Sequence, residues 1–396
     1  MDRSAESNNQ SNTTGDQCMT ATRPRNITAL GVLVLSLGLG ACSKQEEATA
    51  PAEAPESSAG QNVEAPDTAP AAAPVSSDVE VIVTSSLEDM IGILEKENWW
   101  GEPKADEPLQ VPHLLVAAIH PTWQEASRNM PVQQKKALFY RLMLPLVMHA
   151  NKMVMNFRDG LEQAREELAA DGRVSPESLA LLKRLAMLLP GETQEYVDAL
   201  QDNTPELGSM IDALLYRVDV VPPGLALGQA AYESGYGTSR FAVEGNSLFG
   251  QWTYKDDGLK PREQRASKGN HQIKTFEWPF DSVRGYFINL MSHRAYEDFR
   301  RLRAEVRAAG KPMDSLVLAD GLLSYSERGK EYVDSLKGMI RHNHLNMADD
   351  AVLRDEPVRF LLNEDGADKA AALRSDIEKM RASGELQDIV KRMRLD

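Results

Sequence analysis

The sequence predicts a mainly α-helical fold, and three patterns support this interpretation. Apolar residues recur at helical spacing, and no long alternation of apolar and polar residues occurs before about Gly250. The first such helical run contains Leu87, Ile91 and Leu94. A long apolar helical stretch covers 138–157, and Pro145 is expected to kink it. Ser175 and Pro176 form a helix start, with the serine as N-cap and the proline in the first turn.

The rest of the chain is predicted to be helical except for one stretch. Further helices are expected at 193–200, 204–217, 225–233, 282–291, 296–309, 313–323, 332–340, 369–382 and 385–393. The exception is 252–277, which contains Gly258, Pro261 and Gly269 and a short mixed run at 271–276. This composition favours a small β-lobe or hairpin inserted into a helical domain.

The N-terminal segment has the features of a secretory signal. Arg23 and Arg25 precede an apolar run at 27–41, which is too short to span a membrane, and small residues lead up to Cys42. The last four residues of this segment resemble a bacterial lipobox, which implies a signal peptide at 1–42 and a lipid on Cys42. An ordinary buried helix that ends in a cysteine is the alternative interpretation.

The lipobox resemblance also implies a location. Ser43 follows the cysteine, and this favours sorting to the outer membrane, so we expect a periplasmic protein held by its lipid anchor. Because the segment before Met19 is polar, Met19 is a candidate for the true start. Residues 43–80 are rich in Ala, Pro, Glu and Ser and carry eight carboxylates against one lysine, which predicts a disordered, extended tether.

Charge and composition exclude several classes of function. The net charge is −15 and no cluster of Lys and Arg is present, so nucleic acid is not an expected partner. The seven histidines are scattered, and neither a zinc-binding helix motif nor a Gly-rich phosphate loop occurs. We therefore expect no metal and no cofactor.

Glu233 is the residue whose position most clearly indicates catalysis. The proline pair at 222–223 suits a helix start and Gly235 suits its end, so Glu233 falls in the last helical turn. The helix dipole disfavours a carboxylate there, and apolar neighbours such as Phe249 raise its pKa further by desolvation. A glycosidase acid needs this shift to hold its proton near neutral pH. The alternative is that Glu233 pairs with Arg240 or caps a turn.

The stretch 229–252 reads QAAYESGYGTSRFAVEGNSLFGQW and resembles the glucosaminidase domain of bacterial autolysins and the flagellar rod muramidase-type enzyme. It is more similar still to the Bax-type proteins of Gram-negative bacteria. The resemblance extends over about 111–345 and includes KKALFYRLMLPLVMHAN at 135–151, Arg-Val-Asp at 217–219 and the tyrosine motif at 325–332. It implies a lysozyme-like helical fold with a small β-lobe. The resulting organisation is a helical N-terminal region at 81–205, a glucosaminidase domain at 206–346 and a helical C-terminal tail at 347–396.

The resemblance also implies roles for individual residues. Glu233 corresponds to the family's catalytic acid, and Tyr325 to a tyrosine that faces the substrate and hydrogen-bonds the 2-acetamido group or a water. Asn246 is expected to brace the backbone near the acid, while Phe249 packs beneath the cleft. Two further aromatic residues, Trp252 and Tyr236, are expected to line a sugar groove, because sugar CH faces pack on aromatic rings.

A second catalytic carboxylate is expected in the β-lobe. Retaining glycosidases hold their two carboxyl groups about 5 Å apart and inverting ones roughly 6.5–9.5 Å apart. The candidates are Asp256, Asp257, Glu263 and Glu277, of which Glu263 is preferred because it follows Gly258 and Pro261. If none serves, the acetamido oxygen of the substrate is the expected nucleophile.

The function expected from these residues is hydrolysis of the peptidoglycan glycan backbone by an endo-β-N-acetylglucosaminidase. The domain family is also associated with amidase activity. The expected partners are peptidoglycan glycan strands and a membrane, with a regulatory protein that the sequence does not identify. Two alternatives stay open: a lytic transglycosylase, and a non-catalytic wall-binding scaffold.

Overall fold

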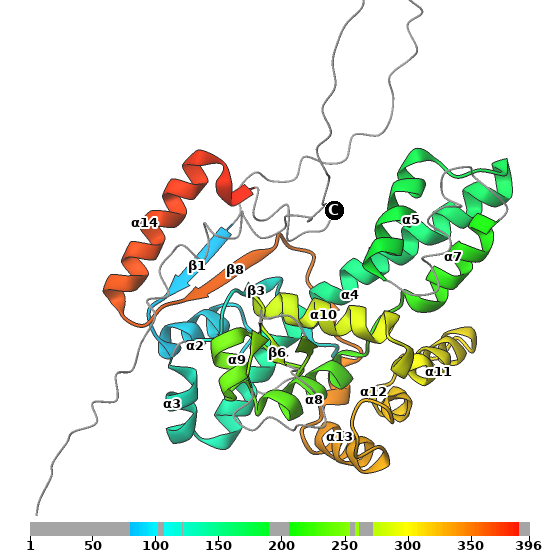
Figure 1. The fold of residues 1–396 in the computed structure, drawn as a ribbon. Helices are drawn as coiled ribbons and strands as arrows, with labels where there is room; N and C mark the ends of the chain where they lie inside the picture. The colour runs from blue at the N-terminus through cyan, green and yellow to red at the C-terminus, as the bar shows by residue number, and fades with distance from the viewer. Residues whose placement is uncertain are drawn as a thin grey trace, which may run out of the picture. The chain divides into compact units, whose positions relative to one another are not determined.

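The computed structural model describes residues 80–101, 107–120, 122–189, 206–253, 258–260 and 272–387. These residues form a mainly α-helical fold (Figure 1), as predicted. Among them, no helix has both the length and the apolar character that a membrane span requires. The predicted signal peptide with Cys42, the tether up to residue 79, the helix at 193–200 and the carboxylates Asp256, Asp257 and Glu263 lie outside the described residues.

The helices follow the predicted order closely. Those in the first part of the chain are α2 (Leu87–Lys96), α3 (Trp123–Asn129), α4 (Val132–Asp171), α5 (Pro176–Leu188) and α7 (Glu206–Arg217). Those in the second part are α8 (Pro223–Ser234), α9 (Arg240–Gly245), α10 (Pro279–Ser292), α11 (Glu297–Ala308), α12 (Ser315–Leu318), α13 (Lys330–His342) and α14 (Ala367–Ser383). Three short 3-10 helices join them: η3 (Arg294–Tyr296), η4 (Ala319–Leu322) and η5 (Leu345–Ala348).

Helix α4 is the longest element and organises the helical packing. It continues through Pro145 to Asp171 and ends where Gly172 adopts a left-handed conformation, with φ at 69°. It contacts α8 and α10 as well as α5 and α7, and the last two lie beside its C-terminal part (Figure 1). The predicted start of α5 is confirmed, because the Ser175 side chain accepts the backbone N–H of Ser178 and Pro176 occupies the first turn.

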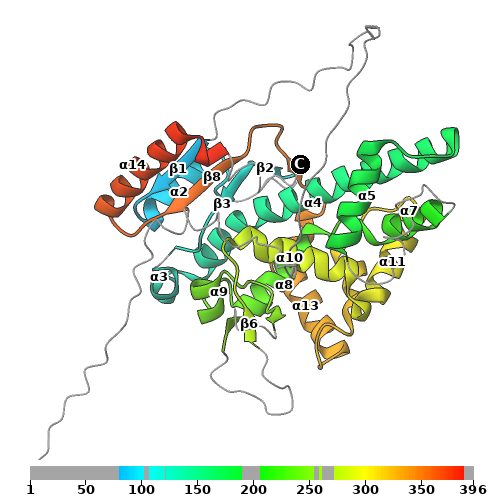
Figure 2. The same ribbon diagram turned by 45° about the horizontal axis from the view of Figure 1, so that its top comes forward.

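A small parallel sheet joins segments from both ends of the described chain. Strand β8 (Arg359–Asn363) lies between β1 (Glu80–Thr84) and β3 (Leu114–Val116), and all three strands are parallel (Figure 2). A second short parallel pair joins β2 (Gln110–Val111) to β7 (Val352–Leu353). Helices α2 and α14 pack on β1, while α4 and α10 pack on β3.

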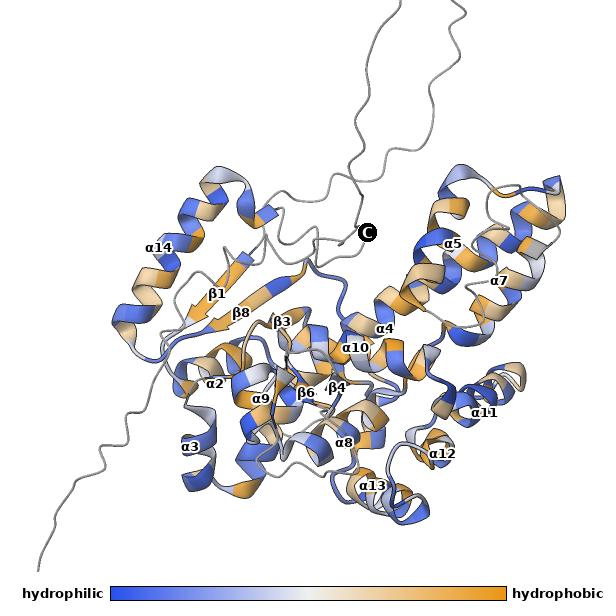
Figure 3. Ribbon diagram, in the orientation of Figure 1, coloured by the Kyte–Doolittle hydropathy of each residue, from blue (hydrophilic) through white to orange (hydrophobic). Residues whose placement is uncertain are grey.

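The prediction that the final segment consists only of amphipathic helices is wrong for residues 359–363, which form β8. The N-terminal helical region likewise contributes β1, β2 and β3. Strands covered by helices on both faces read as short apolar runs without polar alternation, so they lack the signal on which strand prediction depends. Figure 3 shows β1 and β8 as largely hydrophobic.

The predicted β-lobe is present as a three-stranded antiparallel sheet. Strand β6 (Gln272–Lys274) pairs with both β4 (Trp252–Thr253) and β5 (Gly258–Leu259). Backbone hydrogen bonds tie this lobe to the segment before it: Lys274 donates to Gln251 at 2.8 Å and Phe276 donates to Gly245 at 2.8 Å. The β-lobe is therefore attached directly to the turn that follows α9.

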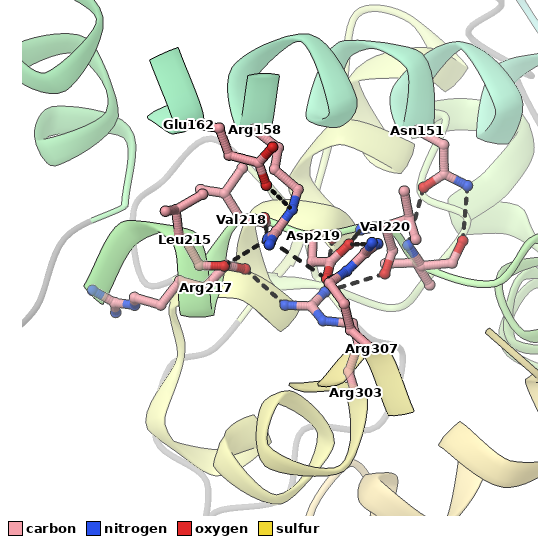
Figure 4. Close-up of polar contacts among 11 residues, drawn as sticks. Asn151, Arg158, Glu162, Leu215, Arg217, Val218, Asp219, Val220, Arg303 and Arg307 are labelled. Carbon is pink, nitrogen blue, oxygen red and sulfur yellow. Dashed lines mark hydrogen bonds and ion pairs between the residues drawn. The ribbon is translucent and has the colours of Figure 1, made fainter. Parts of the chain in front are cut away.

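A buried arginine cluster fixes the chain between α7 and α8 (Figure 4). Arg303 of α11 is fully buried and donates to the carbonyl oxygens of Arg217 and Asp219 at 2.7 Å each. Arg307 binds both carboxylate oxygens of Asp219, and one Nη of Arg158 lies 3.7 Å from the same group. Burial lowers the pKa of Arg303 to about 10. These contacts satisfy the backbone carbonyls of the segment that leads into α8.

Candidate active site

Helix α8 places Glu233 as predicted. The helix begins with Pro222 as N-cap and Pro223 in the first turn, and it ends at Gly235, whose φ is +58°. Every residue of α8 is buried except Tyr232 and Glu233. Glu233 is therefore the one partly exposed carboxylate in the last turn of a buried helix.

The surroundings of Glu233 favour its protonated form. Burial raises the pKa of Glu233 above its ordinary value, and a hydrogen bond with the Tyr332 hydroxyl opposes this shift. No cation of the described residues forms an ion pair with Glu233. Arg240, which sequence reasoning gave as an alternative partner, pairs with Glu244 at 3.1 Å instead. The carboxyl group therefore keeps its proton to higher pH than an exposed glutamate does, as a general acid requires.

Gly250 lies directly against this carboxyl group. Its φ is +64°, a conformation that glycine adopts without strain, and a Cβ added there would lie 3.7 Å from Oε2 of Glu233. The absence of a side chain at Gly250 thus leaves space beside one oxygen of the acid.

Asn246 braces the backbone between α9 and α10. It ends α9 in a left-handed conformation, with φ at 50°, and its Nδ2 donates to the carbonyl oxygens of Phe276 at 3.1 Å and Glu277 at 2.8 Å. These bonds connect the turn after α9 to the segment that enters α10. The side chain of Glu277 itself is exposed.

An aromatic cluster lies behind the acid. The buried ring of Phe249 stacks on Tyr286, with centroids 4.1 Å apart and planes 6° apart. Tyr325 is half-buried, stacks on Tyr332 at 5.4 Å, and donates from its hydroxyl to the carbonyl oxygen of Phe249 at 3.0 Å. The expected bond from the Tyr325 hydroxyl to a substrate acetamido group therefore competes with an existing bond to the protein.

The two predicted groove residues differ in exposure. Trp252 on β4 is 46% exposed, which is high for tryptophan and suits a ring that meets a sugar face. Tyr236 has φ +60°, packs edge-on against Phe139, and lies under the ammonium groups of Lys135 and Lys136 at 5.9 and 5.7 Å. Its ring is therefore covered by cations on the protein's own α4.

Three residues at the site were not assigned a role by sequence reasoning: Gln229, Tyr286 and Tyr332. Tyr286 donates to Oε1 of Gln229 at 2.5 Å, and Nε2 of Gln229 donates to the Tyr332 hydroxyl at 3.0 Å. Gln229 precedes Glu233 by four residues on the same helix, so it lies one turn below the acid. A glutamine at this spacing in an otherwise apolar helix is the signal that points to it.

Two other observations limit where a ligand binds. A cavity of about 40 Å³ between α2, β3, α3 and α4 is lined by apolar groups such as Leu87, Phe139 and Met143, and it does not include Glu233. This cavity is therefore not the site of the acid. Across the described ranges, no group of three or more His, Cys, Asp or Glu side chains is arranged to hold a metal ion.

Comparisons with known proteins match the region around Glu233. Residues 211–345 match the family model described as Glucosaminidase, mannosyl-glycoprotein endo-beta-N-acetylglucosaminidase. The chain is 31% identical over 209 residues to Protein bax of Escherichia coli (strain K12), an overlap of 53% of this chain and 70% of that protein. No solved structure matches the chain.

Proposed function

This chain belongs to the family of Bax-like proteins with a glucosaminidase domain, a peptidoglycan-related hydrolase family, and we propose that it cleaves the glycan backbone as an endo-β-N-acetylglucosaminidase. One observation carries the proposal: Glu233 is only partly exposed, so burial affects its carboxyl group, and it has no ion-pair partner among the described residues. A carboxyl group in these surroundings keeps its proton to higher pH than an exposed one, which suits a general acid.

The mechanism begins with proton transfer to the glycosidic oxygen. Glu233 donates its proton as the bond between C1 of N-acetylglucosamine and the oxygen of N-acetylmuramic acid breaks, which leaves positive charge on the sugar ring. If a second carboxylate serves as base, it takes a proton from a water molecule that attacks C1 from the opposite face. If none serves, the acetamido oxygen of the substrate attacks C1 from that face, and water then opens the resulting oxazolinium ring from the side that the leaving group has left. We propose Glu263 as the second carboxylate. Trp252 supports the proposal as an exposed ring for sugar binding.

Product analysis of digested sacculi tests this proposal. We expect wild-type protein to release fragments with reducing-end N-acetylglucosamine, identified by mass spectrometry. Glu233→Gln should lower the rate by about 10²-fold or more, because a general acid contributes 10²–10⁴-fold. Glu244→Gln is the matched control, since Glu244 is a half-exposed glutamate on neighbouring α9 whose ion pair within the described residues is with Arg240.

Each alternative gives a different result in the same assay. Anhydro-muramyl ends would assign the protein to the lytic transglycosylases and overturn the hydrolase proposal. If wild type and Glu233→Gln are equally inert while both sediment with sacculi, the protein is a wall-binding scaffold.

We also propose that the protein acts from the periplasmic side of the outer membrane, anchored by a lipid on Cys42. The lipobox-like sequence before Cys42 and the acidic tether at 43–80 support this proposal. Labelling cells with a fatty-acid analogue tests it: wild type should incorporate the label and fractionate with outer membranes, and Cys42→Ser should do neither. Label on the Cys42→Ser variant would contradict the proposal.

A further inference from the structure

We propose that Tyr286, Gln229 and Tyr332 form a directed hydrogen-bond relay that aims the single proton of the Tyr332 hydroxyl at the carboxylate of Glu233. The inference rests on the proposed function of Glu233 as the acid. It assigns the three residues a positioning role, because none of them needs to touch the substrate.

The direction of the relay follows from the number of protons that each group carries. A carboxylate only accepts hydrogen bonds, so the ionised form of Glu233 requires the Tyr332 hydroxyl to donate. A hydroxyl has a single proton, so the Tyr332 oxygen must then accept from Nε2 of Gln229, at 3.0 Å. The amide oxygen of Gln229 in turn accepts from Tyr286, at 2.5 Å.

Burial makes this arrangement hard to reverse. Gln229, Tyr286 and Tyr332 are each at most 1% exposed, so water does not compete for their polar groups. If the Gln229 amide turned over, its oxygen would accept the Tyr332 proton, and Glu233 would lose its donor. Tyr286 opposes this, because a turned amide would remove the oxygen that accepts its buried hydroxyl proton. Tyr286 has no bond to Glu233 in this relay, but it sets the orientation of the Gln229 amide and thereby the direction of the Tyr332 proton.

The relay stabilises the product of proton transfer. Gly250 has no side chain, and the position of an added Cβ lies 3.7 Å from Oε2 of Glu233, so there is room beside the carboxyl group. After proton transfer, the Tyr332 hydroxyl donates to the new carboxylate, and a charge-assisted bond of this kind is stronger than a neutral one.

The pH dependence of activity separates this role from a structural one. Tyr332→Phe removes the donor to the ionised form, so the pKa of Glu233 should rise and the basic limb of kcat/KM should move up by about one pH unit. Tyr286→Phe should move the limb in the same direction by a smaller amount, because the amide is then free to turn. Tyr216→Phe is the control: that hydroxyl bonds Glu297 on the surface, and its removal should leave the limb in place.

A fluorinated tyrosine at position 332 provides a test with little change of shape. Its hydroxyl is a stronger acid and a better donor, so the limb should move down, opposite to the Tyr332→Phe shift. Carboxyl ¹³C NMR of glutamate-labelled full-length protein, with Glu233→Gln to assign the signal, measures the same pKa without turnover. Circular dichroism confirms that each variant is folded.

The outcomes distinguish the relay from the proposed function. If Glu233→Gln is inactive but the Tyr332→Phe, Tyr286→Phe and fluorotyrosine proteins all keep the wild-type limb and ¹³C titration, the relay is wrong while the acid stands. If Glu233→Gln stays active, the proposed function fails whatever the tyrosine variants do.

Discussion

Replacing Gly224 by alanine tests how closely α8 must pack for Glu233 to be positioned. Gly224 lies in the first turn of α8, against η5 and α12. A Cβ added to Gly224 would lie 2.4 Å from the carbonyl oxygen of Leu345 and 2.8 Å from Oγ of Ser315. Ordinary carbon–oxygen contacts are about 3.3–3.6 Å, so the start of α8 must move by about 1 Å.

The size of the effect follows from this displacement. The nearest atoms belong to backbone, which yields less than a flexible side chain, and overpacking of this kind costs about 1–3 kcal/mol or more. The backbone N–H of Gly224 also donates to Asp349 at 2.9 Å, and a shift of the helix strains that bond. Because a misplacement of about 1 Å can lower a rate by about 10²-fold, we expect Gly224→Ala to lose activity as well as stability.

Gly338→Ala is the matched control for this prediction. Gly338 is exposed in the middle of α13, and no atom lies within 4 Å of its added Cβ. Alanine there should stabilise the protein by about 0.5–1 kcal/mol, because it favours the helix. Urea unfolding followed by circular dichroism, with sacculus digestion in parallel, measures both variants. A Gly224→Ala protein as stable and active as wild type would refute the packing argument.

Two further predictions concern the acid and the helix that carries it. Gly250→Ala places a methyl group in ordinary contact with Glu233 at a strained φ. The free energy of unfolding should therefore fall by about 1–2 kcal/mol, while kcat/KM should fall by a larger factor. A wild-type kcat/KM would contradict this. Burial raises the pKa of Asp349 to about 6. The free energy of unfolding of the wild type should therefore fall as the pH rises from 3.8 through 6, whereas that of Asp349→Asn should not show this fall. Denaturant unfolding at several pH values measures the difference, and identical pH profiles for the two proteins would count against it.

Much of the candidate site was predictable because its signals are local. The proline pair at 222–223 and Gly235 set the ends of α8, and they place Glu233 in its last turn without any knowledge of the rest of the fold. The β-lobe was predictable for the same reason, since glycines, prolines and a loss of helical periodicity mark it. The second carboxylate, expected at Glu263, stays a prediction.

The parts that sequence reasoning did not find depend on distant contacts. Strand β8 bonds to β1, and Thr84 donates to Asn363 across 279 positions, so nothing near residues 359–363 indicates their partner. Tyr286 enters the site only because α10 and α8 both pack against α4. Gln229 differs from these residues, because its spacing of four residues from Glu233 could have been noticed in the sequence alone.

The central position of β8 imposes an order on folding during synthesis. Until residues 359–363 leave the ribosome, β1 and β3 emerge with no strand between them and with their backbone groups unpaired. The helices that carry Glu233 and its tyrosines are translated before that point, so they can pack first. A nascent chain released early would combine a packed helical region with two unpaired apolar strand edges, which are the templates that drive aggregation.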